Sequence, residues 1–152
     1  MINNFWQTKN VFVTGGSGLI GSWLTQELVN RGANVICLIR DEVNSSNFKS
    51  LNLNKKVTLV KGEIENFDLI LRTINEYEID TIFHLAAQTI VTTANRSPRS
   101  TFETNIKGTW NILEAARQLN TKRTIIASSD KAYGTHEKLP YVEDAKRSGL
   151  HP

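Results

Sequence analysis

The fold is decided by the stretch Thr14-Gly15-Gly16-Ser17-Gly18-Leu19-Ile20-Gly21 and by what lies on either side of it. The apolar run at 11–13 precedes it and predicts a buried strand. Apolar residues then recur at helical spacing, and Gly32 predicts the helix end. A glycine-rich turn between a strand and a helix brings backbone N–H groups and the positive end of a helix dipole against a phosphate. The stretch therefore predicts a dinucleotide-binding loop, with a tight turn that binds no ligand as the alternative.

Three glycines in this loop have separate expected tasks. Gly15 would let the chain turn sharply, Gly18 would leave room for the phosphate, and Gly21 would let the helix pack closely on the strand. The residues expected to hold the pyrophosphate, largely through their backbone, are Gly15, Ser17, Gly18, Leu19, Ile20 and Gly21.

The rest of the chain alternates short apolar strands with amphipathic helices. Strands that are apolar on both faces predict a parallel sheet covered on both sides by helices. Right-handed crossovers then give an α/β fold, a doubly wound, Rossmann-like sheet with the first strand central, here truncated after strand five. Residues 41–56, with at most one weak helical turn, and residues 134–152 are expected to be loops. The further strands are expected at 35–39, 57–60, 81–83 and 124–127, and the further helices at 67–77 and from about 98 to 119.

Composition narrows the class of protein. The 152 residues predict a single domain, and 39% hydrophobic with 22% charged residues is an ordinary globular balance. The net charge is +3, but the basic residues are scattered rather than clustered, which argues against nucleic acid as a partner. Cys37 is the only cysteine, which excludes an intrachain disulfide and fits a reducing compartment. With no signal peptide expected before the first strand and no apolar run near the ~20 residues of a membrane span, a cytoplasmic protein without a membrane contact is predicted.

The loop spacing is Gly-x-x-Gly-x-x-Gly, not Gly-x-Gly-x-x-Gly. It resembles the extended branch of the short-chain dehydrogenase/reductase superfamily, which contains nucleotide-sugar epimerases and dehydratases. That branch typically reads Thr-Gly-Gly-x-Gly-Phe-Ile-Gly here, and Leu19 replaces the phenylalanine conservatively. The resemblance implies that residues 1–152 are an NAD(P)-binding Rossmann domain.

Four residues after the second and third strands bear on the cofactor. Asp41 could accept from a ribose 2′-hydroxyl, which favours NAD, whereas Arg40 could pair with a 2′-phosphate, which favours NADP. The resemblance favours NAD slightly and leaves NADP open, and solvated loop charges are the alternative. Gly62-Glu63-Ile64 stands where the family has Gly-Asp-Ile, and the family's Asp accepts a hydrogen bond from the adenine amino group. The Glu63 side chain is one methylene longer than that Asp.

Two further segments match family motifs that lie near the cofactor. His84-Leu85-Ala86-Ala87-Gln88 follows the fourth strand and matches His-x-Ala-Ala. The resemblance implies that Leu85, Ala86, Ala87 and Gln88 pass the ribose and nicotinamide, while His84 is interpreted as structural. In the third helix, it implies that Thr104 approaches the cofactor and that Asn105 supports the active-site hydrogen bonds.

The segment Ser128-Ser129-Asp130-Lys131-Ala132-Tyr133-Gly134 after the fifth strand is the most informative about chemistry. The superfamily places its catalytic Ser or Thr at the Ser129 position, and Ser128 lies beside the cofactor. Epimerases usually continue with small residues, whereas CDP-glucose 4,6-dehydratases have Ser- or Thr-Asp-Lys, as here. A 4,6-dehydratase removes water from C6 of the sugar, and Asp130 could donate the proton that this step needs. Lys131 would pair with Asp130 or with the substrate. The alternative for Asp130 is a helix cap or a turn residue without a role in catalysis. Tyr133 is interpreted as structural.

The CDP-glucose 4,6-dehydratases are the best resemblance over nearly the whole chain, and the GDP-mannose dehydratases, which usually carry Glu in this segment, are a weaker one. The superfamily's Tyr-x-x-x-Lys pair is absent from the 152 residues, which stop just before the expected tyrosine. The chain is therefore interpreted as the N-terminal part of a dehydratase acting on a nucleotide sugar, inactive alone. The alternatives are part of a 4-epimerase or a non-catalytic nucleotide-binding module. The helix near 99–119 pairs subunits in the superfamily, which predicts a homo-oligomer.

Overall fold

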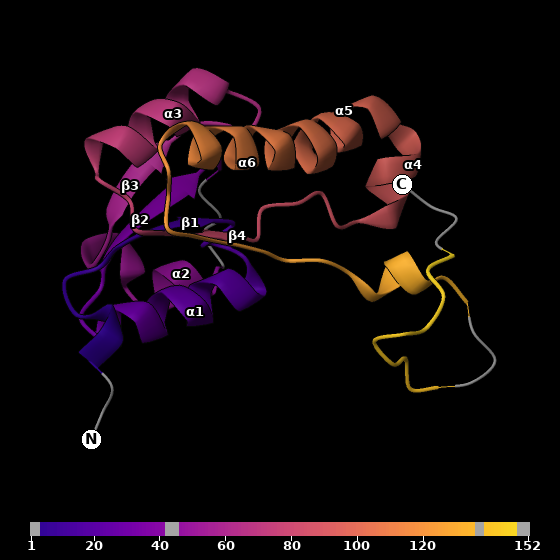
Figure 1. Ribbon diagram of the computed structural model, residues 1–152, viewed down its shortest axis with the longest axis horizontal. Helices are drawn as coiled ribbons and strands as arrows, with labels where there is room; N and C mark the ends of the chain where they lie inside the picture. The colour runs from indigo at the N-terminus through magenta and orange to yellow at the C-terminus, as the bar shows by residue number, and fades with distance from the viewer. Residues whose placement is uncertain (1–3, 42–45, 136–138, 149–152) are drawn as a thin grey trace.

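The computed structural model describes residues 4–41, 46–135 and 139–148. Five parallel strands form one sheet in the order β3-β2-β1-β4-β5 (Figure 1). The first strand is therefore central, and the predicted doubly wound α/β fold is confirmed. The strands are β1 (Asn10–Thr14), β2 (Asn34–Ile39), β3 (Thr58–Lys61), β4 (Thr81–His84) and β5 (Arg123–Ile126).

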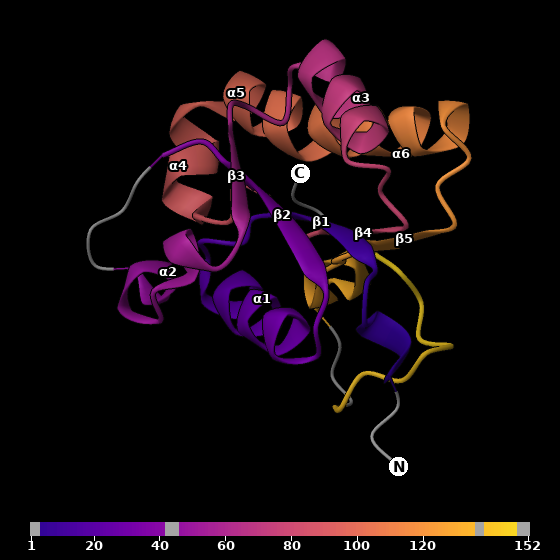
Figure 2. The same ribbon diagram turned by 90° about the vertical axis from the view of Figure 1, so that its left-hand side faces the viewer.

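Helices lie on both faces of the sheet (Figure 2). The helices α1 (Leu19–Asn30) and α2 (Asn47–Ser50) cover one face, and α3 (Phe67–Glu76) and α6 (Gly108–Gln118) cover the other. Alternate residues of each strand enter the two cores: Val11 and Val13 of β1 pack on the α1 side, and Phe12 packs on the α3 side. All three are fully buried, as a central parallel strand requires.

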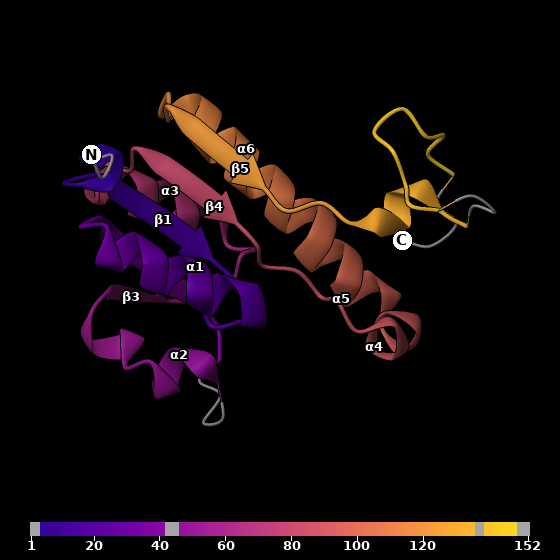
Figure 3. The same cartoon turned by 90° about the horizontal axis from the view of Figure 1, so that it is seen from below.

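The long helix predicted from 98 to 119 is present, but it is not α-helical throughout. It consists of α5 (Pro98–Phe102), a π-helical turn η3 (Glu103–Lys107) and α6, joined without a break (Figure 3). A π turn inserts one residue into the helix and is frequent at functional sites. A short helix before it, α4 (Val91–Arg96), was not predicted, because its residues all lie at least partly exposed and give no apolar periodicity.

The segment expected to be a loop with at most one helical turn contains two. In addition to α2, a 3₁₀ turn, η2, spans Leu53–Lys55. Phe48 and Leu53 are buried in the core on the α1 side, so two apolar anchors shape an otherwise polar segment. Residues 42–45 of the expected loop lie outside the described residues.

Strand β5 is covered by helices on one face only. On the α1 side, no helix of the described ranges lies over β5 (Figure 3). The neighbouring strand β4 is covered on that side by Trp6 of the 3₁₀ turn η1 (Asn4–Trp6), whose ring centroid lies 5.8 Å from that of Phe83. Ile125 of β5 is 44% exposed, so the strand carries exposed apolar surface.

Among the described residues, no helix combines the length and apolarity needed to cross a membrane. Within the same ranges, no three His, Cys, Asp or Glu side chains gather as ligands for a metal ion.

Candidate functional site

The residues predicted to form the site meet at one edge of the sheet. They follow the carboxyl ends of the five parallel strands, and these ends lie on the same side. In open α/β sheets, ligands bind outside this edge, near the point where the strand order reverses. That point lies between β1 and β4, which are neighbours in the sheet although β2 and β3 separate them in sequence.

The loop between β1 and α1 has the backbone shape expected of a phosphate loop. Gly15 has φ +72°, and a Cβ there would lie 2.7 Å from Ala86 N, so only glycine fits the turn. Gly18 differs: its φ is −72°, and among the described atoms a Cβ would meet only the Gly15 carbonyl oxygen, at 3.2 Å. A side chain at Gly18 would therefore crowd only this one carbonyl, and the expectation that a phosphate lies in front of Gly18 stays a prediction.

The first turn of α1 is suited to an anion. Within the described residues, no side chain caps this helix end, although its first N–H groups lack partners inside the helix. Leu19 and Ile20 are 74% and 71% exposed, so the peptide groups of this turn lie at the surface. Uncapped N–H groups beside an open glycine fit a pyrophosphate.

The expectation for Gly21 needs a correction. A Cβ at this residue would lie 2.1 Å from the Gly15 carbonyl oxygen and 2.9 Å from Gly16 Cα. The close approach that requires glycine is therefore between the helix and the phosphate loop itself, and not between the helix and the strand. Gly21 fixes the loop's shape rather than the packing of α1 on the sheet.

Charges after β2 already compensate one another. Arg40 Nε donates to Asp41 Oδ2 at 2.6 Å, and this bond, together with the nearby carboxylates of Glu63 and Glu65, raises the pKa of Arg40. Three carboxylates therefore surround one guanidinium at the position expected to contact the adenosine ribose. A 2′-phosphate would add negative charge to a group of side chains that is already negative.

Of the pair after β3, only one residue has an exposed side chain. Glu63 is exposed, whereas Ile64 is 4% exposed and belongs to the core on the α3 side. The Ile64 side chain is therefore not available to a cofactor, and only its main chain could contact one. Its carbonyl accepts from Asn111 Nδ2 at 3.0 Å.

The loop after β4 is clamped by the π turn. Gln88 N donates to Asn105 Oδ1 at 2.7 Å, and Asn105 Nδ2 donates to the Gln88 carbonyl at 3.1 Å. Asn105 therefore holds the backbone of Gln88 on both sides, and its support of active-site hydrogen bonds stays a prediction. Leu85 and Ala86 are half-buried and Ala87 is exposed, so the backbone of the loop can face a ligand.

Thr104, next to Asn105, has a partner that the sequence did not indicate. Its hydroxyl donates to Glu65 Oε1, so it is tied to the loop after β3. Thr104 was expected to approach the cofactor, and its hydroxyl is engaged with protein instead. The sequence analysis did not single out Glu65, although its position two residues after Glu63 was an available signal.

His84 is a structural residue, as interpreted. It is 3% exposed, and its two ring nitrogens contact Thr14 Oγ1 at 2.7 Å and Thr109 Oγ1 at 2.9 Å. Burial lowers its pKa to about 4. Thr109 carried no signal in the sequence, because a single threonine in a helix has many roles.

Ser129, Asp130 and Lys131 lie after β5 and are all exposed. Ser129 Oγ accepts from Lys131 N at 3.2 Å and donates to Asp130 Oδ1 at 3.3 Å. Lys131 Nζ lies 3.7 Å from Asp130 Oδ2. Ser129 therefore caps the 3₁₀ turn η4 (Asp130–Tyr133), so Asp130 is not the cap. It is the first residue of that turn, as the alternative of a turn residue predicted. Ser128, just before this turn, is exposed as well.

Tyr133 has the structural surroundings expected of it. Its ring stacks on Tyr141 with centroids 5.2 Å apart, and Tyr141 Oη donates to the Gly134 carbonyl at 2.8 Å. Figures 1 and 3 show that this segment extends beyond the sheet.

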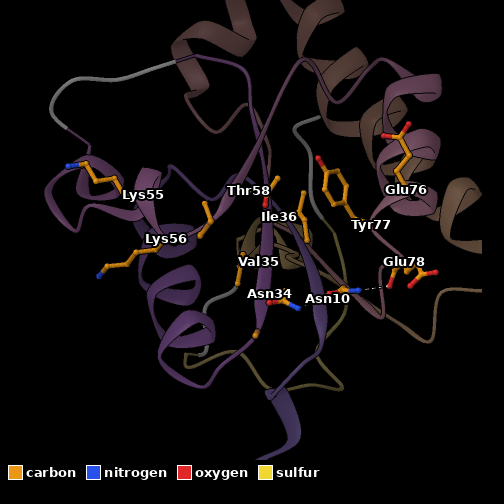
Figure 4. A pocket seen from close by; sticks show the side chains of 12 residues that line it. Asn10, Asn34, Val35, Ile36, Lys55, Lys56, Thr58, Glu76, Tyr77 and Glu78 are labelled. Atoms are coloured by element: carbon orange, nitrogen blue, oxygen red, sulfur yellow. Dashed lines mark hydrogen bonds between the residues drawn. The ribbon is translucent and has the colours of Figure 1, made fainter.

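A hollow of about 570 Å³ lies at the opposite edge of the sheet (Figure 4). It is formed at the amino ends of β1, β2 and β3, with Lys55 and Lys56 on one side and Glu76 and Glu78 on the other. None of the predicted site residues lines it. Because α/β sheets of this kind bind ligands at the carboxyl edge, the hollow does not change the location of the site.

Known proteins resemble this chain over nearly its full length. A family model described as GDP-mannose 4,6 dehydratase matches residues 12–152. The CDP-glucose 4,6-dehydratase of Salmonella typhimurium is 36% identical over 152 residues, which cover 98% of this chain and 42% of the relative. The UDP-glucose 4-epimerase of Lactobacillus helveticus is 31% identical over 142 residues, which cover 93% of this chain and 42% of the relative. The chain thus spans less than half the length of these curated relatives.

The solved structures agree with the fold and with the expected cofactor. A UDP-glucose 4-epimerase from Stenotrophomonas maltophila, with bound NAD and formylated UDP-arabinopyranose, has a TM-score of 0.82 at 26% identity, covering 94% of this chain and 44% of that one. Three other neighbours were also solved with NAD. The description of the matching family model names a GDP-mannose dehydratase. The motif after β5 resembles the CDP-glucose enzymes more than the GDP-mannose enzymes. Because the family model matches residues 12–152, the chain belongs to the nucleotide-sugar dehydratase and epimerase family of the extended short-chain dehydrogenase/reductases.

Proposed function

We propose that this chain is the NAD-binding part of a nucleotide-sugar 4,6-dehydratase. The observation that carries the proposal is an exposed carboxylate, Asp130, directly beside the hydroxyl of Ser129 at the carboxyl edge of the sheet. Because Ser129 caps the following turn, Asp130 is not needed as the cap. An acid in this place suits proton donation to a leaving hydroxyl, which an epimerase does not require.

NAD is the proposed cofactor, held by the backbone of the loop from Gly15 to Gly21 and the first turn of α1. When bound, it supplies a hydride acceptor for the sugar C4 and a hydride donor for C6. Asp41 would accept from the ribose hydroxyl, and the carboxylates around Arg40 disfavour a 2′-phosphate. Paired calorimetric titrations should give tighter binding of NAD than of NADP.

Charge-removing variants test this choice of cofactor. Asp41→Asn should weaken NAD binding and narrow the gap to NADP, whereas Arg40→Ala should change NAD affinity little. Arg31→Ala is a matched control. Arg31 also pairs with an exposed carboxylate, that of Glu27 at 2.7 Å, but it lies away from the carboxyl ends of the strands, where the proposed site is. An Arg40→Ala variant that loses NADP binding and keeps NAD binding would instead show that Arg40 reads a 2′-phosphate.

The residues after β5 have distinct proposed roles. Ser129 positions the oxygen on C4 of the sugar while that carbon is oxidised. The C6 hydroxyl leaves as water when the C5 proton is removed and Asp130 donates a proton to the leaving oxygen, and Lys131 holds Asp130 or the substrate. The 152 residues contain no Tyr-x-x-x-Lys pair to take the C4 proton, so the chain alone is proposed to be inactive.

The decisive experiment replaces the matching segment of the Salmonella typhimurium enzyme with residues 1–152. With CDP-glucose, Asp130→Asn should slow water loss but not oxidation, so an absorbance typical of NADH should accumulate. Ser129→Ala should slow oxidation itself and give no such absorbance. Asp144→Asn, which changes another exposed acid of the same segment, is the control. Equal loss of both steps in Asp130→Asn would contradict the division of roles.

A 4-epimerase is the second candidate, favoured by relatives such as the Lactobacillus helveticus enzyme. An epimerase has no water to eliminate, so Asp130→Ala would leave its turnover intact. A chain that binds NAD but supports neither reaction in the joined polypeptide would be a nucleotide-binding module.

We also propose that the chain associates with a second copy through the long helix. Its outer face carries an exposed apolar stripe: Phe102, Ile106, Trp110 and Leu113. A Trp110→Glu change should shift sedimentation towards the monomer. Sedimentation of the unaltered chain as a monomer at all concentrations would contradict this proposal.

A further inference from the structure

The structure contains a chain of hydrogen bonds that runs from β1 through β4 into the long helix. Thr109 Oγ1 donates to the Asn105 carbonyl at 2.7 Å, which uses the single proton of that hydroxyl. Towards His84 Nε2, 2.9 Å away, Thr109 can therefore only accept. The ring must carry its proton on Nε2.

The other ring nitrogen completes the assignment. With the proton on Nε2, a neutral imidazole has a lone pair on Nδ1, which lies 2.7 Å from Thr14 Oγ1. Thr14 must then donate to His84, and its oxygen accepts from Ala86 N at 3.2 Å. Every donor in the chain of bonds has one acceptor, and the direction runs from Ala86 to Thr14 to His84 to Thr109 to Asn105.

This chain of bonds touches both loops of the proposed cofactor site. Thr14 immediately precedes Gly15, whose backbone packs against Leu85 and Ala86. Asn105 holds Gln88 through both atoms of its amide. His84 lies between them and is 3% exposed, so water does not compete for these bonds.

We infer that His84 is a positioning residue that acts as a neutral Nε2–H tautomer and sets the spacing between the phosphate loop and the strand-four loop. This inference rests on the proposed NAD binding, because it assigns His84 a part in orienting both loops for that ligand. His84 itself touches protein groups, so its effect on the cofactor is transmitted through Thr14 and Asn105.

Thr109→Val tests the inference, because valine keeps the shape of threonine and removes the hydroxyl. NAD affinity, measured by calorimetry, should fall about five- to tenfold, as expected when one buried hydrogen bond is left unmade. Thr109→Ser restores the hydroxyl and should keep the affinity of the unaltered chain. Thr73→Val is the matched control: Thr73 Oγ1 also donates to the carbonyl four residues earlier, Leu69, at 2.7 Å, but in α3.

The tautomer gives a second readout that needs no ligand. In a long-range ¹H–¹⁵N correlation spectrum at pH 7, the His84 ring should show a protonated Nε2 and an unprotonated Nδ1, and Thr109→Val should lose this single state. The Nδ1–H tautomer or a doubly protonated ring in the unaltered chain would overturn the inference, as would equal losses of NAD affinity in Thr109→Val and Thr73→Val. If the unaltered chain binds no NAD, the proposed function fails, and the ring spectrum still decides the hydrogen-bond chain.

Discussion

The loops after β1, β3 and β4 and the segment after β5 belong to one proposed site, but they are built in opposite ways. The first three are tied to one another and to the long helix through Thr14, His84, Asn105 and Asn111, all at least partly buried. The described residues after β5, 128–135 and 139–148, are mainly exposed, and bonds such as Tyr141 to Gly134 join them to each other. The difference teaches that the proposed cofactor part of the site is preorganised by buried contacts, whereas the proposed sugar-facing part has few of them.

Lowering the pH should have the largest effect on stability, because it favours protonation of the buried His84. The pKa of His84 is lowered from its model-compound value of 6.5 to about 4, so the unfolded chain binds a proton at a higher pH than the folded one. The contribution of the neutral His84 to the free energy of unfolding is therefore fully present above pH 6.5. It is lost as the pH falls towards 4, by about 3 kcal/mol in total. Urea unfolding between pH 7 and 4 measures the loss, and His84→Asn should flatten the dependence. An unchanged slope in that variant would assign the loss to other groups.

Gly18→Val should separate binding from folding. The position has an ordinary φ, and a Cβ there would crowd only the Gly15 carbonyl oxygen, at 3.2 Å. We therefore expect the valine variant to fold with a small shift of the loop while its side chain occupies the expected phosphate position. NAD affinity should fall at least about a hundredfold, which is about 2.7 kcal/mol. A calorimetric titration of the folded variant decides, and unchanged affinity would remove the loop from the site.

Gly21→Ala should do the reverse and damage the fold. Its Cβ would lie 2.1 Å from the Gly15 carbonyl oxygen, a contact that only a shift of the loop can relieve. We expect a loss of about 2 kcal/mol in the free energy of unfolding, despite the better helix propensity of alanine. Gly18→Ala is the matched control in thermal melts, and similar melting temperatures for the two variants would contradict the assigned contact.

Changes after β5 should have the smallest effect on stability. The ion pair of Asp130 and Lys131 is exposed, at 61% and 81% of its side-chain surfaces. Exposed pairs of this kind contribute little, so Asp130→Asn should change the free energy of unfolding by less than about 0.5 kcal/mol. A larger loss in chemical denaturation would show that Asp130 supports the fold, which would weaken its assignment to catalysis.

The hydrophobic pattern predicted the five strands and the three main helices, and the right-handed crossover rule predicted that β1 is central. It could not predict α4, whose residues lack a buried face, or the π turn, which depends on bonds between Asn105 and a loop distant in sequence. In the site, glycine spacing predicted the phosphate loop, but the partner of Gly21 is a carbonyl that only the folded loop brings near. Thr109 and Glu65 were missed because a lone hydroxyl or acid has no signature until its partner is known.

The π turn at Glu103–Lys107 absorbs one extra residue within the long helix. Because an α-helix advances by about 100° per residue, each residue after the turn lies where its predecessor in sequence would lie in an uninterrupted α-helix. In this register Thr109 faces His84 and Asn111 faces the Ile64 carbonyl, while Trp110 between them is exposed. Deleting one residue from the turn should therefore restore an α-helical turn and keep these three residues in place, whereas an α-helical turn of unchanged length would rotate them away by about 100°. The orientation of the helix faces thus depends on the π conformation of five residues.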